Sequence, residues 1–240
     1  INYEMIATNP ADHIRTQINH DKKRRIAFSN DDLARIFHSP IYTDNFRPIG
    51  GGVDACYWLP LLALFTGARV EELAQLLVQD LRLAQGLGYY LNISDEAAHS
   101  QLKNYSSRRR IPLHPELLSC GFLDYVNGIK EQNFMFPALK PNPRKKLGGY
   151  FSTFFSGYLR RTVRITDRRK VFHSFRHTFK DTCRAVGIEE SVHDALTGHT
   201  NPTAGRKYGN EQYPLRPLFE AMQRFKIEGL ALSHLHTEEA

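Results

Sequence analysis

The spacing of apolar residues predicts a chain built mainly from helices. Ser29 is followed by acidic residues, which is typical of a helix start, because short polar side chains cap free N–H groups and acids suit the positive end of the helix dipole. Leu33, Ile36 and Phe37 then give this helix an apolar side. Residues 53–65 are almost continuously apolar and predict a buried helix.

The pattern after this buried helix predicts further helices and a small sheet. Thr66-Gly67 interrupts it, and apolar positions up to Leu77 mark the inner side of the next helix. Strands are expected at 89–93, just before Lys103 and at 109–113, and they form an antiparallel sheet. The remaining helices are expected at 150–163, 174–186, 190–197, 202–208 and 215–227, and the loops at 41–52 and 137–149. The expected fold class is mainly α with a small antiparallel β-sheet (α+β).

Two domain segments are expected. Residues 1–27 are polar and end in a basic run, so they are interpreted as a linker or the tail of a missing N-terminal domain. Residues 28–240 form one domain whose last part, 214–240, is a C-terminal helix and tail. The chain begins with Ile1, so we expect a fragment whose N-terminal part has been cut away.

Charge is the one compositional property that points to a partner. The 240 residues are 41% hydrophobic and 24% charged, as in ordinary soluble globular proteins. Lys and Arg number 32 against 25 Asp and Glu, a net charge of +7 that permits a polyanion partner. The basic residues are concentrated in runs at 22–25, 108–110, 144–146 and 160–170. Four runs together favour a surface that follows a phosphate backbone.

Other compositional features exclude some classes of protein. Cys56, Cys120 and Cys183 are far apart and include no C-x-x-C, so neither disulfides nor a zinc site are expected and a reducing cytoplasm is the natural compartment. No apolar run approaches the roughly 20 residues that span a bilayer, and no signal peptide is visible. The absence of a tight acidic cluster argues against a metal-dependent nuclease.

Two pairs of residues have the spacing of a phosphate site. Arg69 and Glu72 are three positions apart on a helix and share a face, so the carboxylate can hold the guanidinium for phosphate oxygens. The ordinary alternative is a surface ion pair. His173 and Arg176 repeat this spacing at the start of another helix, and the alternative there is a histidine hydrogen-bonded at a helix end.

The remaining candidates have weak local signals. His199 follows Gly198, a typical helix-ending glycine, and Tyr208 comes shortly afterwards. A tyrosine in such a place is usually a packing residue with a solvated hydroxyl. Lys103 is expected near the tip of a hairpin, where a solvated lysine is the usual alternative to a proton donor.

Taken in order, these positions form a family pattern. The first box is TGARVEEL at 66–73, the hairpin lysine is Lys103 followed by SRRRIPL at 107–113, the second box is HSFRH at 173–177, and Gly198-His199 precedes Tyr208 by nine residues. The chain resembles the catalytic domain of tyrosine recombinases, the phage-integrase family, over about residues 28–213. It departs from the family pattern at Ser174, Gly205 and Asn210, where aspartate, threonine and histidine are frequent.

The resemblance implies a covalent mechanism without metal, ATP or another cofactor. Tyr208 would attack the scissile phosphodiester and form a 3′-phosphotyrosyl link with release of a 5′-hydroxyl. Arg69 and Arg176 would neutralise the non-bridging oxygens, and His199 would add a hydrogen bond. Lys103 would protonate the leaving oxygen.

The same resemblance assigns supporting residues. His173 would assist proton transfer with the tyrosine, and Glu72 and His177 would support the arginines and histidines. Contacts with the DNA backbone are expected from the residues of three basic runs: Lys22, Lys23, Arg24, Arg25, Arg108, Arg109, Arg144, Lys145 and Lys146.

The partners and the biological role follow as implications of the resemblance. The chain would bind double-stranded DNA at an attachment site, be a monomer in isolation and form a tetramer on DNA, with residues 214–240 exchanged between protomers. Accessory DNA-bending or directionality proteins are further implied partners, and no membrane is involved. The implied role is integration or excision of a phage or mobile element in the cytoplasm of a bacterium. The alternatives are a type IB topoisomerase-like enzyme and a DNA-binding regulator that kept the fold and lost catalysis.

Overall fold

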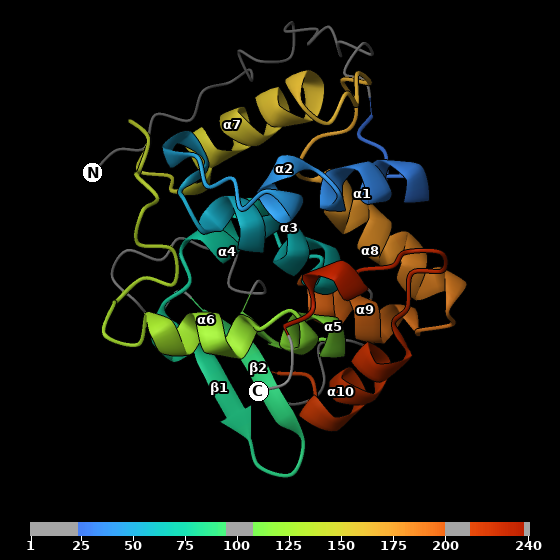
Figure 1. The fold of residues 1–240 in the computed structure, drawn as a ribbon. Coiled ribbons are helices and arrows are strands. Elements are labelled where there is room, and N and C mark those ends of the chain that lie inside the picture. The colour runs from blue at the N-terminus through green and yellow to red at the C-terminus, as the bar shows by residue number, and fades with distance from the viewer. Residues whose placement is uncertain (1–23, 95–107, 200–211, 238–240) are drawn as a thin grey trace, which may run out of the picture.

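A buried central helix organises the fold. The computed structural model describes residues 24–94, 108–199 and 212–237, and Figure 1 shows helix α3 (Ala55–Thr66) surrounded by other helices, with a small sheet at one end. The stretch Ile49–Thr66 is long and apolar enough to cross a membrane by length and composition alone, but 72% of it is buried inside the molecule, as in the core helix of a soluble protein. The predicted class, mainly α with a small antiparallel sheet, is confirmed.

Helix α3 ends at a glycine whose position requires the absence of a side chain. Gly67 has φ +62°, in the left-handed region, and a Cβ there would lie 2.6 Å from Cδ1 of Phe179. The chain turns sharply at this point and enters α4 (Val70–Ala74). Helix α4 was predicted to continue to Leu77 but ends at Ala74.

The N-terminal elements are α1 (Asn30–Phe37), α2 (Pro40–Thr43) and the 3-10 helix η1 (Ile49–Gly51). The predicted cap of α1 is confirmed, since Ser29 Oγ accepts from Asp32 N at 3.2 Å and the Asp32 carboxylate accepts from Ser29 N at 2.9 Å. The prediction that 41–52 is only a loop is wrong. Pro40 suits the first turn of a helix, where no N–H is needed, and two short helices form.

Within the described residues, the sheet has three antiparallel strands in the order β1-β2-β3, with bounds Leu81–Ala84, Gly88–Ile93 and Arg109–Pro112. Leu91 pairs with Leu81 on one side and with Ile111 on the other, which fixes the register. Strand β1, reached through the 3-10 helix η2 (Val78–Asp80), was not predicted. The strand expected before Lys103 lies outside the described residues.

The second half of the chain is helical. Helices α5 (Pro115–Ser119) and α6 (Phe122–Gly128) were not predicted, whereas α9 (Glu190–Thr197) has its predicted bounds. Helices α7 (Gly148–Arg161), α8 (Ser174–Ala185) and α10 (Leu215–Arg224) are present with ends shifted by one to three residues from those predicted. The helix expected at 202–208 lies outside the described residues.

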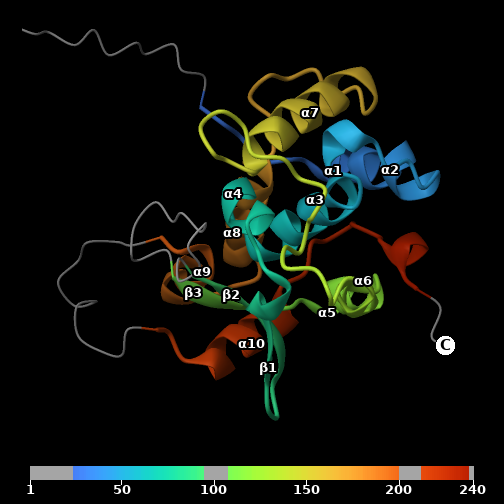
Figure 2. The same ribbon diagram turned by 90° about the vertical axis from the view of Figure 1, so that its left-hand side faces the viewer.

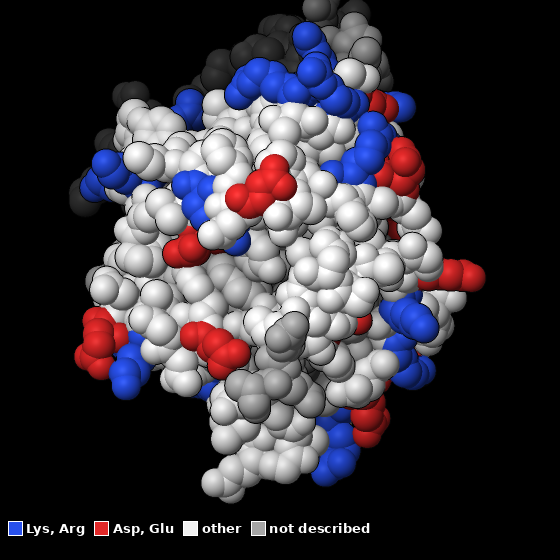
Figure 3. Space-filling view, viewed as in Figure 1, with Lys and Arg blue, Asp and Glu red and all other residues white. Residues whose placement is uncertain are grey.

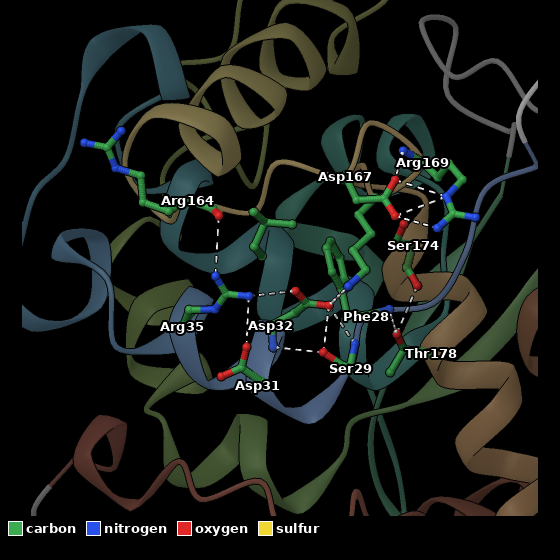
Figure 4. Close-up of polar contacts among 12 residues, drawn as sticks. Phe28, Ser29, Asp31, Asp32, Arg35, Arg164, Asp167, Arg169, Ser174 and Thr178 are labelled. Atoms are coloured by element: carbon green, nitrogen blue, oxygen red, sulfur yellow. Dashed lines mark hydrogen bonds and ion pairs between the residues drawn. The ribbon is translucent and has the colours of Figure 1, made fainter.

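A buried carboxylate fastens the loop between α7 and α8 to helix α1. Asp32 is 1% exposed and accepts hydrogen bonds from Ser29 and from Lys170 of the loop. Arg35 reaches from Asp32 to the backbone carbonyl of Arg164 (Figure 4). The loop leads directly into α8, so this network ties the segment before α8 to helix α1.

The segment after α10 folds back on helix α1. After α10, residues Phe225, Leu232 and Leu235 are buried, the last of them in the 3-10 helix η5 (Ser233–Leu235). Asn30 Nδ2 donates to the carbonyl of Glu228 at 2.7 Å, and His234 Nε2 lies 2.8 Å from the carbonyl of Phe37. The described C-terminal segment therefore packs on the core of its own chain.

Candidate active site

Arg69 and Glu72 form the predicted pair at the start of α4. The Glu72 carboxylate accepts from Arg69 N at 2.8 Å and from Arg69 NH1 at 2.6 Å. The Glu72 side chain is 6% exposed, whereas that of Arg69 is 31% exposed. The carboxylate thus holds the arginine from inside, and part of the guanidinium remains accessible to an anion.

Arg109 of strand β3 binds the same carboxylate from the other side. Its NH2 lies 2.7 Å from Glu72 Oε2, and its Nε donates to the carbonyl of Leu196 in α9 at 2.7 Å. Arg109 is 5% exposed. The expected DNA-backbone contact does not fit this position, because the guanidinium is turned inward and engaged with protein acceptors.

The two arginines keep Glu72 ionised. Burial alone would raise the pKa of Glu72, but the charge and hydrogen bond of Arg109, with those of Arg69, outweigh it and lower the pKa to about 2. Glu72 is therefore a carboxylate at neutral pH, and it balances part of a cluster of positive charge.

Arg176 brings helix α8 to this cluster. It lies in the first turn of α8, is 7% exposed, and donates from NH1 to the carbonyl of Gly67 at 2.8 Å. Burial and the charges of Arg69 and Arg109 lower the pKa of Arg176 to about 10. It stays protonated at neutral pH, and the three arginines repel one another wherever no anion lies between them.

His173 lies at the N-cap position of the same helix and is exposed to solvent. Desolvation of the ring, then the charges of His177, Arg176, Arg69 and Arg25, lower the pKa of His173 to about 4. The imidazole is neutral at physiological pH, which is the form that can accept a proton. The His177 ring lies across it, 5.2 Å away between centroids.

His199 is placed by the end of helix α9. Gly198 has φ +63°, and a Cβ on it would lie 3.0 Å from NH1 of Arg109. His199 N then donates to the carbonyl of Asp194 at 3.0 Å. The Asp194 side chain is 3% exposed and accepts from Lys180 of α8 at 3.0 Å, an ion pair that joins the two helices. Neither Lys180 nor Asp194 was a predicted site residue.

The structure does not place every predicted residue. Lys103, Tyr208, Lys22 and Lys23 lie outside the described residues. The remaining basic positions expected to touch DNA are exposed or partly exposed: Arg24, Arg25, Arg108, Arg144, Lys145 and Lys146.

The basic loop at 144–146 is anchored beside the pair of Arg69 and Glu72. Glu71, next to Glu72 on α4, accepts from the backbone N–H groups of Leu147 and Gly148 at 3.0 and 2.9 Å. Within the loop, the Asn142 side chain accepts from the backbone of Arg144 and Lys146. The loop therefore ends against α4, where Glu71 lies two positions after Arg69.

The site lies on one side of the molecule. Figure 2 places α8, α9 and β3 on one side and α2 and α6 on the other. Figure 3 shows the side of α2 and α6, where acidic and basic side chains are mixed on a largely uncharged surface and basic ones gather near α7. In the part of the chain that the structure describes, no group of three or more His, Cys, Asp or Glu side chains is arranged to hold a metal ion.

The alternation of residues along a strand could have identified Arg109 as a buried arginine from the sequence. Successive residues of a strand point to opposite faces, so Arg109 shares a face with Ile111 and Leu113. Ile111 is fully buried and Leu113 is 4% exposed. An arginine on the apolar face of a strand must find internal acceptors, which separates it from Arg108 and Arg110 in the same basic run.

Comparison with solved structures identifies the fold. The integrase of mycobacterium phage Brujita matches with a TM-score of 0.54 and 17% identity over 90% of this chain and 63% of that integrase. The Tn1549 transposon integrase in complex with transposon right end DNA matches with a TM-score of 0.48 and 20% identity over 82% of this chain and 65% of that integrase. XerA recombinase matches with a TM-score of 0.49 and 15% identity over 75% of this chain and 57% of that recombinase. The likeness to the phage integrase shows that this chain has the same fold.

The chain spans 57 to 65% of the lengths of the three proteins. No protein-family model and no curated protein matches the chain.

Proposed function

We propose that the chain is the catalytic domain of a tyrosine-type site-specific DNA recombinase. The observation that carries the proposal is the meeting of Arg69 and Arg176 beside a neutral His173. Arg176 binds the carbonyl of Gly67, 109 positions earlier in the chain, so separate motifs converge on one cationic site. The fold of a phage integrase and the order of the motifs support the same function.

In the proposed reaction, the scissile phosphate lies between the two arginines, which balance the charge that develops on its non-bridging oxygens. His173, uncharged at neutral pH, accepts the phenolic proton as the Tyr208 oxygen attacks phosphorus. The bond from phosphorus to the 5′ oxygen breaks, and Lys103 protonates that oxygen. His199 donates a hydrogen bond to the phosphate, and attack by a 5′-hydroxyl of another duplex reverses the step.

The proposed DNA contacts surround this site. The contacts come from two segments of the chain. One segment carries Arg24 and Arg25, and the other is the loop 144–146, which is attached to α4 beside the site. Lys22, Lys23 and Arg108 would extend the contact, whereas Arg109 is not proposed to touch DNA. Phosphate contacts of this kind supply affinity and position but little sequence specificity.

Further parts of the proposal concern the assembly. We propose a clamp completed by an N-terminal core-binding domain, a tetramer on DNA in which residues 214–240 are exchanged, and accessory proteins that bend DNA or set direction. The role would be integration or excision of a phage or mobile element, in the cytoplasm. The Tn1549 transposon integrase has been solved in complex with transposon right end DNA.

The test is covalent trapping in the presence of EDTA. The 240-residue chain is incubated with nicked duplexes that carry a randomised core, and DNA that stays attached to protein in detergent is recovered and sequenced. We expect adducts with the wild type and none with Tyr208→Phe. An adduct that persists in Tyr208→Phe moves the nucleophile elsewhere, with Tyr213 as the first alternative. A requirement for magnesium overturns the mechanism, and plasmid relaxation without strand exchange favours a topoisomerase.

A further inference from the structure

We propose that Arg109 is a positioning residue that sets Arg69 and His199 relative to each other. The inference rests on the proposed function, and it assigns Arg109 a role different from the expected DNA contact. The geometry that carries it is a single buried guanidinium between the two halves of the site. Strand β3 supplies the guanidinium, α4 supplies Glu72 on one side, and the last turn of α9 supplies a carbonyl on the other.

The first half of the argument is the shared carboxylate. Glu72 Oε2 accepts from Arg109 NH2 at 2.7 Å and from the backbone N of Arg69 at 2.8 Å, while Oε1 accepts from Arg69 NH1 at 2.6 Å. Glu72 is thus fixed from both sides. Without Arg109, the Glu72 carboxylate would be held by Arg69 alone and could rotate. The direction of the Arg69 guanidinium would then no longer be fixed.

The second half is the end of helix α9. Arg109 Nε donates to the Leu196 carbonyl at 2.7 Å, one of the last carbonyls of the helix, which lacks a helical partner. Gly198 packs on the same guanidinium so closely that a Cβ would lie 3.0 Å from NH1. His199 is the next residue. The guanidinium therefore fixes the position of the last turn of α9 and, with it, the position of the His199 backbone.

Only arginine has the shape for this task. Its planar fork donates in two directions at once, whereas a lysine ammonium is a point charge on a flexible stem. Arg109 is 5% exposed, so it cannot also reach a phosphate on the surface. A side chain that holds other residues in this way determines the placement of the groups that touch the substrate, and small misplacements of such groups cost large factors in rate.

The experiment compares two substitutions of Arg109 with a matched control. Arg109→Lys keeps the charge and loses the fork, and Arg109→Gln loses both the charge and the fork. Arg82→Gln removes an arginine charge from an exposed position on strand β1 of the same sheet. Each protein is checked for folding by circular dichroism and thermal unfolding. Cleavage is then measured by adduct formation at saturating nicked DNA, well below each melting temperature, and the DNA dissociation constant is measured separately.

We expect cleavage at saturating DNA to fall about 100-fold in Arg109→Lys, because a misplaced group at a reacting centre costs about that factor. The DNA dissociation constant should stay close to that of the wild type, because Arg109 does not contact DNA, and Arg82→Gln should cleave normally. A folded Arg109→Lys that cleaves at the wild-type rate overturns the inference. A loss confined to DNA affinity also overturns it, in favour of a backbone contact.

The split between cleavage and binding separates positioning from a purely structural role. Loss of the fork in a folded Arg109→Lys or Arg109→Gln should slow cleavage at saturating DNA while the DNA dissociation constant and the unfolding transition change little. If only Arg109→Lys folds, its cleavage rate decides. If the wild type forms no adduct with any DNA, the proposed function itself has failed, which is a distinct result.

Discussion

Replacing Glu72 with glutamine removes one buried negative charge and changes the side-chain shape very little. The pKa of Glu72 is about 2 in the folded chain, because Arg109 and Arg69 outweigh the cost of burial, against an ordinary value of 4.5. A lowered folded-state pKa stabilises the protein above the ordinary pKa, and this stability is lost as the pH falls toward the folded value. Glu72→Gln should therefore be less stable than the wild type at pH 7, and the difference should shrink in acid.

The size of the effect follows from the two pKa values. A shift from 4.5 to about 2 corresponds to about 3 kcal/mol at pH 7 and to about 1 kcal/mol at pH 3. The difference in unfolding free energy between wild type and Glu72→Gln should thus be about 2 kcal/mol smaller at pH 3 than at pH 7.

Urea unfolding of both proteins between pH 3 and pH 7 measures this difference directly. Groups common to the two proteins, such as His173, largely cancel when the two curves are subtracted. A difference that is constant over this range refutes the reasoning, because it would mean that the arginines do not stabilise the ionised carboxylate. A difference that grows as the pH falls would reverse the sign of the argument.

Three further outcomes follow from the packing. Gly67→Ala should destabilise the fold by about 1–3 kcal/mol in urea unfolding, since φ is +62° and the new Cβ would press on Phe179, and an unchanged midpoint would contradict this. Lys170→Met should cost about 1–3 kcal/mol because the buried Asp32 loses a charged partner, whereas Arg169→Met, which breaks a surface pair on the same loop, should leave the unfolding midpoint nearly unchanged. Thiol reagents at pH 8 should not label the folded chain, and early labelling would contradict the burial that raises the pKa of each cysteine to about 12. These cysteines are Cys56, Cys120 and Cys183.

Periodic segments were predictable from the sequence, and short ones were not. Helices α8 and α9 have sustained apolar stripes, so their existence and their first residues were predicted. Helix α5 has only five residues and strand β1 only four, with Arg82 and Leu83 exposed, so neither produces a recognisable period. Their formation depends on tertiary packing, which a single sequence does not display.

The site was predictable where its residues lie on one element. Arg69 and Glu72 are three positions apart, and the geometry of a helix start brings them together, with Arg69 at the N-cap of α4 and Glu72 in its first turn. The contact of Arg109 with the Leu196 carbonyl joins residues 87 positions apart and depends on how α9 packs against β3. The basic run around Arg109 suggested a surface contact, and only the burial of the strand face distinguishes this arginine from its neighbours.

The folding of the segment after α10 onto its own chain affects how readily that segment could be exchanged between molecules. Phe225 and Leu235 are buried against the core of their own chain. The segment of a second copy would place the same side chains in the same positions. The two arrangements would then be nearly equal in contact energy, and the balance would be set by effective concentration. A segment of the same chain is held near its own binding site at an effective concentration of about millimolar. Free molecules below that concentration keep their own ends, and exchange becomes favourable only where several copies are held side by side.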